Sequence, residues 1–212
     1  MQIAKQALHG ATDSSTRGSR ARGQLRAKKI LETAQEILSN EGYHSLTLRK
    51  IAKTMSISNG NVTYYFANKE QLLQAIISDN LARYDAAFER EARSFPDDPE
   101  SRIRAYFAFL VDDARNQKSQ RFFYQLWALS SHNAEVARQR DKVYEHFLHQ
   151  VTAQLKSVRP QMKEDEILRK CFLMMSSIEG MNVMYGSGKE LREKFGDDRH
   201  WIVDQILRIA YS

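Results

Sequence analysis

The chain has 212 residues and a formal net charge of +6, with 42% hydrophobic and 27% charged side chains. This balance excludes a largely disordered chain, and the lack of an apolar run of about 18 residues excludes a membrane-spanning helix. The single cysteine, Cys171, excludes an intrachain disulfide, and the first ten residues carry no secretory pattern, so we expect a cytoplasmic protein. Three prolines and few alternating β-branched residues favour an all-α fold.

The positive charge is concentrated near the N-terminus. Residues 1–66 contain ten Lys or Arg and four Asp or Glu, whereas the remaining basic and acidic side chains cancel. Such a segment on a neutral body is typical of a nucleic-acid contact surface, with a solubilising tail as the alternative. Residues 1–23 lack sustained periodicity and are predicted to form a flexible basic arm.

Three helices are predicted between residues 24 and 70. The first begins at Gln24 and ends before Gly42, and the second follows Thr47, a favourable N-cap residue. A short turn containing Ile57, expected to be buried, leads to a third helix that Ser58 caps and that runs to Phe66. Two short helices joined by a three-residue turn have the geometry of a helix-turn-helix DNA-binding domain.

Residues 71–212 are predicted to form a second, helical domain, giving about nine helices in all. The predicted ranges are Lys69 to about Ser94, a helix from Pro99 with Asp98 as N-cap, Gln120–Ser131, Asn133–Val158, Glu164–Tyr185 ended by Gly186 and Gly188, and Asp197–Tyr211.

The third helix carries the pattern that points to DNA. Val62 and Phe66 share one face and are expected to be buried, which leaves Asn61, Thr63 and Tyr64 on the opposite face. Gly60, also on that face, would permit close approach of the backbone, while the polar side chains would contact base edges and phosphates. The alternative is a three-helix core with an incidentally polar face.

The stretch from residue 30 to residue 73 resembles the TetR family of bacterial repressors. The residues that carry the resemblance are Ile30, Ala34, Gly42, Tyr43, Thr47, Leu48, Ile51, Ala52, Ile57, Ser58, Gly60, Val62, Tyr64, Tyr65, Phe66, Lys69, Glu70 and Leu73. The resemblance, together with the helix pattern, implies an operator-facing set of Thr47, Arg49, Ser58, Asn59, Gly60, Asn61, Thr63, Tyr64, Tyr65 and Lys69. Ser56 and Thr63 depart from the family, which often has Gly and usually Tyr there.

The resemblance also implies a homodimer through the last two long helices, bound to a palindromic operator, and a small ligand in the second domain. A single subunit would then leave Trp201, Ile202, Ile206 or Met174 partly exposed. The predicted ligand-binding residues are Phe107, Phe123, Trp127, Tyr144, Phe147, Met175, Glu179 and Asn182, although most could be ordinary core. Glu179 would be the partner of a cationic ligand.

The sequence therefore predicts a repressor that a small-molecule inducer releases from its operator. The alternative is a ligand-independent dimeric DNA-binding protein, which a packed core would favour over a closed pocket of more than about 300 Å³. No catalytic motif is present, so we expect neither an enzyme nor a cofactor. His146 and His149 share a helical face but lack further metal ligands, and Cys171 is expected to be a packed core residue.

Overall fold

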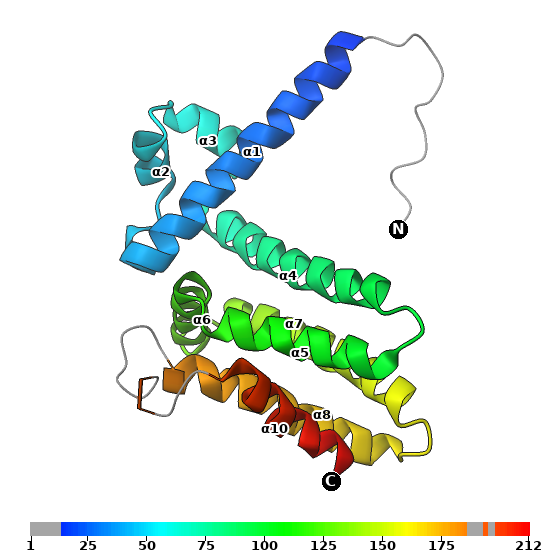
Figure 1. The fold of residues 1–212 in the computed structure, drawn as a ribbon. Helices are drawn as coiled ribbons and strands as arrows, with labels where there is room; N and C mark the ends of the chain where they lie inside the picture. The colour runs from blue at the N-terminus through cyan, green and yellow to red at the C-terminus, as the bar shows by residue number, and fades with distance from the viewer. Residues whose placement is uncertain (1–13, 186–192, 195–197) are drawn as a thin grey trace.

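A computed structural model describes residues 14–185, 193–194 and 198–212. Within these residues it contains nine α-helices and one short 3₁₀ helix, and no strand (Figure 1). The expected all-α fold is therefore confirmed. None of the helices in the described ranges is both long and apolar enough to cross a membrane.

The N-terminal helices form a small bundle around one core. They are α1 (Ser14–Glu41), α2 (Leu48–Thr54) and α3 (Asn59–Tyr65), with the 3₁₀ turn η1 (Tyr43–Ser45) between the first two. Gly42 ends α1 with a φ of 81°, a conformation that favours glycine. Each helix contributes a fully buried residue to one shared core, which holds the bundle together: Ile30, Ile51 and Val62.

The helix α4 (Lys69–Ser94) connects this bundle to the rest of the chain. Its N-terminus is capped by the Asn68 side chain, which accepts from the Gln71 amide at 2.8 Å. Leu72 and Ile76 are fully buried near its start, and Tyr84 is buried near its middle. One helix thus lies in the cores of both parts of the molecule, so a shift at one end is transmitted to the other.

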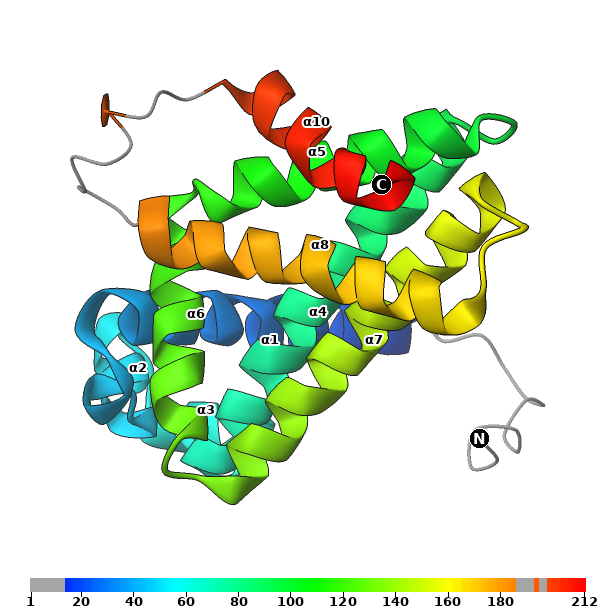
Figure 2. The same cartoon turned by 90° about the horizontal axis from the view of Figure 1, so that it is seen from below.

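The remaining helices are α5 (Pro99–Ala114), α6 (Gln117–Ser130), α7 (Ala134–Val158), α8 (Glu164–Tyr185) and α10 (Arg199–Tyr211). Figures 1 and 2 show α8 and α10 side by side at the end of the molecule opposite to α2 and α3. The helix α6 contacts the N-terminal bundle, because the Tyr43 amide donates to Gln125 Oε1 at 3.2 Å and Arg121 donates to Asn40 at 2.7 Å.

Several helix boundaries differ from the sequence prediction. The helix α1 begins at Ser14, ten residues before the predicted Gln24, so residues 14–23 are helical, and α6 begins at Gln117 rather than Gln120. The predicted glycine stop of α8 falls on residues outside the described ranges. By contrast, α4 and α8 have the predicted ends.

Burial also differs from the prediction at several residues. Ile57 and Phe66 are only half-buried, although both pack against the core. Met174, Ile202 and Ile206 are buried within one subunit, so the expectation that they are partly exposed is wrong, while Trp201 is 60% exposed. The cause is that α10 packs its aliphatic face onto α8 and α5 of the same chain.

Candidate functional site

The turn between α2 and α3 is closed by local backbone hydrogen bonds. Ser56 adopts a φ of 53°, in the left-handed region that favours glycine, and the Ile57 amide donates to Ala52 O at 3.0 Å. The Ser58 hydroxyl then accepts from the Asn61 amide at 3.2 Å and starts α3. The two short helices are therefore held at a fixed angle, as a helix-turn-helix requires.

The outer face of α3 has the predicted composition. Val62 is fully buried and anchors the helix, while Asn59, Gly60, Asn61 and Thr63 are exposed and Tyr64 is 83% exposed. A Cβ atom added at Gly60 would meet only Ser58 Oγ, at 3.8 Å. The protein itself therefore does not require glycine there, whereas a partner that approaches the backbone closely would.

The other predicted DNA contacts lie around this face. Thr47, Arg49 and Ser58 are exposed, and Tyr65 is half-buried with its ring 5.0 Å from that of Tyr64.

Lys69 differs from the other predicted contacts because its ammonium group is already engaged. Its Nζ donates to Tyr43 O at 2.6 Å and lies 3.5 Å from the centre of the Tyr43 ring. Burial lowers the pKa of Lys69 and raises that of Tyr43. The contact ties the start of α4 to η1, so Lys69 positions the helix-turn-helix.

The second domain contains a narrow interior crevice between α4, α5, α6, α7 and α8, with a volume of about 10 Å³, room for about one water molecule. Five of the eight predicted ligand residues line it: Phe123, Phe147, Met175, Glu179 and Asn182. The sequence analysis missed five further lining residues: Tyr84, Leu110, Asp113, Ala114 and Ile178. Phe107 is fully buried in the core and does not line this crevice.

Glu179 is the acidic group of this region. Its carboxylate is hydrogen-bonded by the Asn182 amide at 3.4 Å and by the Tyr144 hydroxyl, which also accepts from Trp127 Nε1 at 2.8 Å. Burial is the main cause that raises the pKa of Glu179 to about 7, and the nearby Asp113 carboxylate raises it further. Among the described residues, the groups that shift this pKa include no cation. Within the part of the chain that the structure describes, the carboxylate therefore has no positive partner that shifts its pKa.

Glu179 also forms part of a surface groove between α7 and α8. The groove has a volume of about 500 Å³ and shares Met175 and Glu179 with the crevice. Tyr144, Leu148 and Phe172 supply its apolar walls, and Asp141, Glu145 and Ser176 complete the lining. The predicted residues Tyr144, Met175 and Glu179 thus meet in an open groove next to the crevice.

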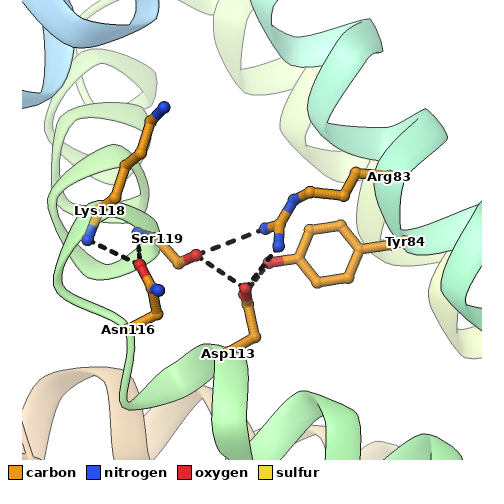
Figure 3. A network of polar contacts seen from close by, with 6 residues as sticks. All are labelled: Arg83, Tyr84, Asp113, Asn116, Lys118 and Ser119. Atoms are coloured by element: carbon orange, nitrogen blue, oxygen red, sulfur yellow. Dashed lines mark hydrogen bonds and ion pairs between the residues drawn. The ribbon is translucent and has the colours of Figure 1, made fainter.

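Asp113 connects the crevice to α4 through a polar network (Figure 3). Its carboxylate accepts from Arg83 at 2.6 Å, from Ser119 Oγ at 2.8 Å and from the Tyr84 hydroxyl. Asn116 caps the start of α6 beside it. Because Arg83 and Tyr84 belong to α4, Asp113 holds that helix to α5 and α6.

The remaining candidate residues have structural partners. His146 Nε2 lies 2.6 Å from Asp85 Oδ1, and the described part of the chain contains no group of three His, Cys, Asp or Glu residues arranged to hold a metal ion. Cys171 is buried in the core, and burial raises the pKa of its thiol. A raised pKa disfavours the reactive thiolate, so Cys171 has the properties of a packed core residue.

A small helical bundle with an exposed third helix forms a helix-turn-helix domain, which α4 joins to a larger helical domain. Residues 30–76 match the family model described as bacterial regulatory proteins, tetR family. The chain is also 30% identical over 115 residues to the HTH-type transcriptional regulator BetI of Stenotrophomonas maltophilia (strain R551-3), which covers 54% of this chain. Residues 30–76 are thus similar to the bacterial regulatory proteins of the tetR family.

Two solved structures have the same fold over most of their length. A protein described as a transcriptional regulator from Pseudomonas aeruginosa PAO1 has a TM-score of 0.76, with 13% identity over 94% of this chain and 95% of its own. A protein described as a transcriptional regulator from Saccharomonospora viridis, solved in complex with choline, has a TM-score of 0.65, with 18% identity over 87% and 95%. The chain spans 59% of the length of the Stenotrophomonas relative.

Proposed function

We propose that this protein is a DNA-binding transcriptional regulator that places α3 in the major groove of an operator. The observation that carries the proposal is the exposed face from Asn59 to Tyr64 on a helix that buried Val62 anchors from behind. Amide and hydroxyl side chains on this face match the donors and acceptors of base edges and phosphates. The match of residues 30–76 to the TetR family model supports the same function.

The test is selection of binding sites from random duplexes with the full chain, followed by affinity measurements on the selected site. Asn61→Ala and Tyr64→Ala are expected to weaken binding by roughly tenfold or more, because each base or phosphate contact contributes about 1–3 kcal/mol. Lys142→Ala, an exposed change on α7, is the control and is expected to bind normally. Equal affinity of all three variants would contradict the proposal.

We also propose that two copies associate through α8 and α10. Phe172 is 62% exposed on α8 and Trp201 is 60% exposed on α10, together with exposed Leu173, Val183 and Met184. An apolar face of this kind marks an interaction surface. A two-fold dimer would present two α3 helices to half-sites about 34–36 Å apart on a palindromic operator.

The ligand class that the second domain fits best is a small organic cation. Glu179 has no cationic partner among the groups that shift its pKa, and Tyr144, Phe172 and Phe147 supply aromatic walls around it. Aromatic rings beside a carboxylate are the surroundings that bind quaternary ammonium groups. Choline, with which the Saccharomonospora neighbour was solved, is a cation of this kind.

Ligand binding would reach the DNA-binding domain through α4. Asp113 lies in the crevice with Glu179 and holds Arg83 and Tyr84 of α4. A cation that enters beside Glu179 competes with Arg83 for the Asp113 carboxylate and widens the crevice, which displaces α4 and changes the spacing of the two α3 helices. The protein would then act as a repressor that the cation releases from its operator.

The experiment that tests the ligand class compares choline with 3,3-dimethylbutan-1-ol, its uncharged carbon analogue, in thermal unfolding of the full chain. Choline is expected to raise the unfolding temperature and to reduce operator affinity, while the neutral analogue does neither. Equal shifts with both compounds would contradict a cation site.

A ligand-independent dimeric DNA-binding protein is the second candidate function. The observation that favours it is the volume of the crevice, about 10 Å³, which is far below the closed pocket of more than about 300 Å³ that would favour ligand sensing. Operator affinity that does not change at saturating concentrations of organic cations would support this candidate.

A further inference from the structure

The first half of α1 carries most of the excess positive charge of the chain and lies outside the family match. Sixteen helical residues, 14–29, precede residue 30, where that match begins. They contain six basic and no acidic side chains: Arg17, Arg20, Arg22, Arg26, Lys28 and Lys29. Figure 1 shows this half of α1 running beyond α3 and away from α4. Burial of apolar side chains does not explain why this segment is helical, because Leu25 is 55% exposed.

A broad groove separates this segment from the end of α3. It has a volume of about 810 Å³, and its walls are residues 22–27 and Lys29 of α1 and Tyr64 and Tyr65 of α3. A Cβ atom added at Gly23 would lie 3.8 Å from the Tyr65 hydroxyl, so the two helices approach closely at the floor of the groove.

The basic residues are distributed unevenly around α1. Arg22, Arg26 and Lys29 are spaced at i, i+4 and i+7, which places them on one face of the helix. All three are exposed and line the groove, whereas Lys28 is also exposed but does not line it. The groove therefore has a row of three cations on one wall and the most exposed aromatic residue of the recognition face, Tyr64, on the other.

We propose that this groove binds the sugar-phosphate backbone of DNA that flanks the base pairs contacted by α3. The inference rests on the proposed function and extends it, because it assigns a second contact surface that reads charge rather than sequence. A row of three cations suits a line of phosphates, and neutralising them would release condensed counterions. The Tyr64 hydroxyl can donate to the same backbone, so the two surfaces are continuous.

The test measures the affinity of the full chain for its selected operator as a function of salt, by fluorescence anisotropy. Arg26→Gln is compared with Lys28→Gln, which removes the same charge from the opposite side of the helix. Arg26→Gln is expected to weaken binding roughly three- to tenfold at physiological salt and to lower the salt slope by about 1 per subunit. Lys28→Gln is expected to change affinity by less than about twofold.

A second comparison uses the length of the duplex and the triple variant Arg22→Gln, Arg26→Gln, Lys29→Gln. Lengthening the operator by about five base pairs on each side is expected to tighten binding of the unaltered chain but not of the triple variant. The triple variant is also expected to keep the same preference among operator base substitutions, whereas Asn61→Ala changes it. Circular dichroism of each variant checks that helicity is retained.

The results separate this inference from the proposed function. If the triple variant keeps the affinity and salt slope of the unaltered chain, while Asn61→Ala relaxes base preference, the groove does not bind DNA and only the inference fails. Equal losses of operator affinity in Arg26→Gln and Lys28→Gln would also overturn the inference, since the losses would then reflect the net charge of the protein rather than the groove. If the unaltered chain binds no duplex, both proposals fail.

Discussion

The sharpest prediction concerns Glu179→Gln and its dependence on pH. Burial raises the pKa of Glu179 to about 7 from an ordinary value of 4.5, which corresponds to a free energy of about 3 kcal/mol. Because the side chain is only half-buried, solvent reduces this to about 2 kcal/mol. The folded state holds the proton more tightly, so stability should fall as the pH rises from about 4.5 to 7, as the carboxylate becomes charged. A glutamine side chain stays neutral over this pH range, so Glu179→Gln should remove this pH-dependent loss of stability.

The assay is chemical denaturation of both proteins between pH 5 and pH 8, at a fixed protein concentration because the proposed dimer makes stability depend on it. The free energies of unfolding should be similar at pH 5, and the Gln variant should be more stable by about 2 kcal/mol at pH 8. All other ionisable groups are common to both proteins, so their contributions cancel in the difference. A difference that does not vary with pH would refute the reasoning.

The same residue controls the expected affinity for cations. Only the charged carboxylate attracts a cation, so choline should bind the unaltered chain about tenfold more weakly at pH 6 than at pH 8. The Gln variant should bind choline weakly at both values. An affinity for choline that is unchanged by Glu179→Gln would place the ligand elsewhere.

Three further changes test other parts of the structure. Ser56→Gly should stabilise the chain by about 0.5–1 kcal/mol in denaturant unfolding, because its φ of 53° strains any residue but glycine; a loss would contradict this. Asp113→Ala should cost about 2–4 kcal/mol in the same assay, since it leaves Arg83 and Tyr84 without their acceptor; a change below about 0.5 kcal/mol would contradict it. Leu173→Asp should convert the proposed dimer to monomers in light scattering with unchanged helicity.

The helix-turn-helix could be predicted from sequence because its signals are local. Gly42, Thr47 and Ser58 each mark a helix end through their own backbone or side chain, and the structure confirms all three. The start of α1 could not be predicted in the same way. Residues 14–23 are helical but lack an apolar stripe, which is the signal that the prediction needed.

The crevice was predicted only in part, because the sequence does not show which faces of distant helices meet. Phe123, Phe147 and Met175, which we expected at a ligand site, line it, whereas Phe107 is buried in the core. Asp113 was missed because one acidic residue at the end of a helix resembles a surface charge until its partners on α4 and α6 are known.

The position of Glu179 favours the ligand-responsive candidate that we propose for the second domain. A purely structural core would gain stability by replacing a half-buried carboxylate that has no cationic partner among the groups that shift its pKa. The carboxylate instead lies where the crevice meets the groove, within reach of solvent through the groove and beside Asp113 on its inner side. A cation arriving from the groove would therefore gain its attraction to Glu179 before the crevice opens, and that attraction can drive the opening. Under this proposal, the crevice of about 10 Å³ would be the closed, unliganded form, and ligand binding would have to widen it.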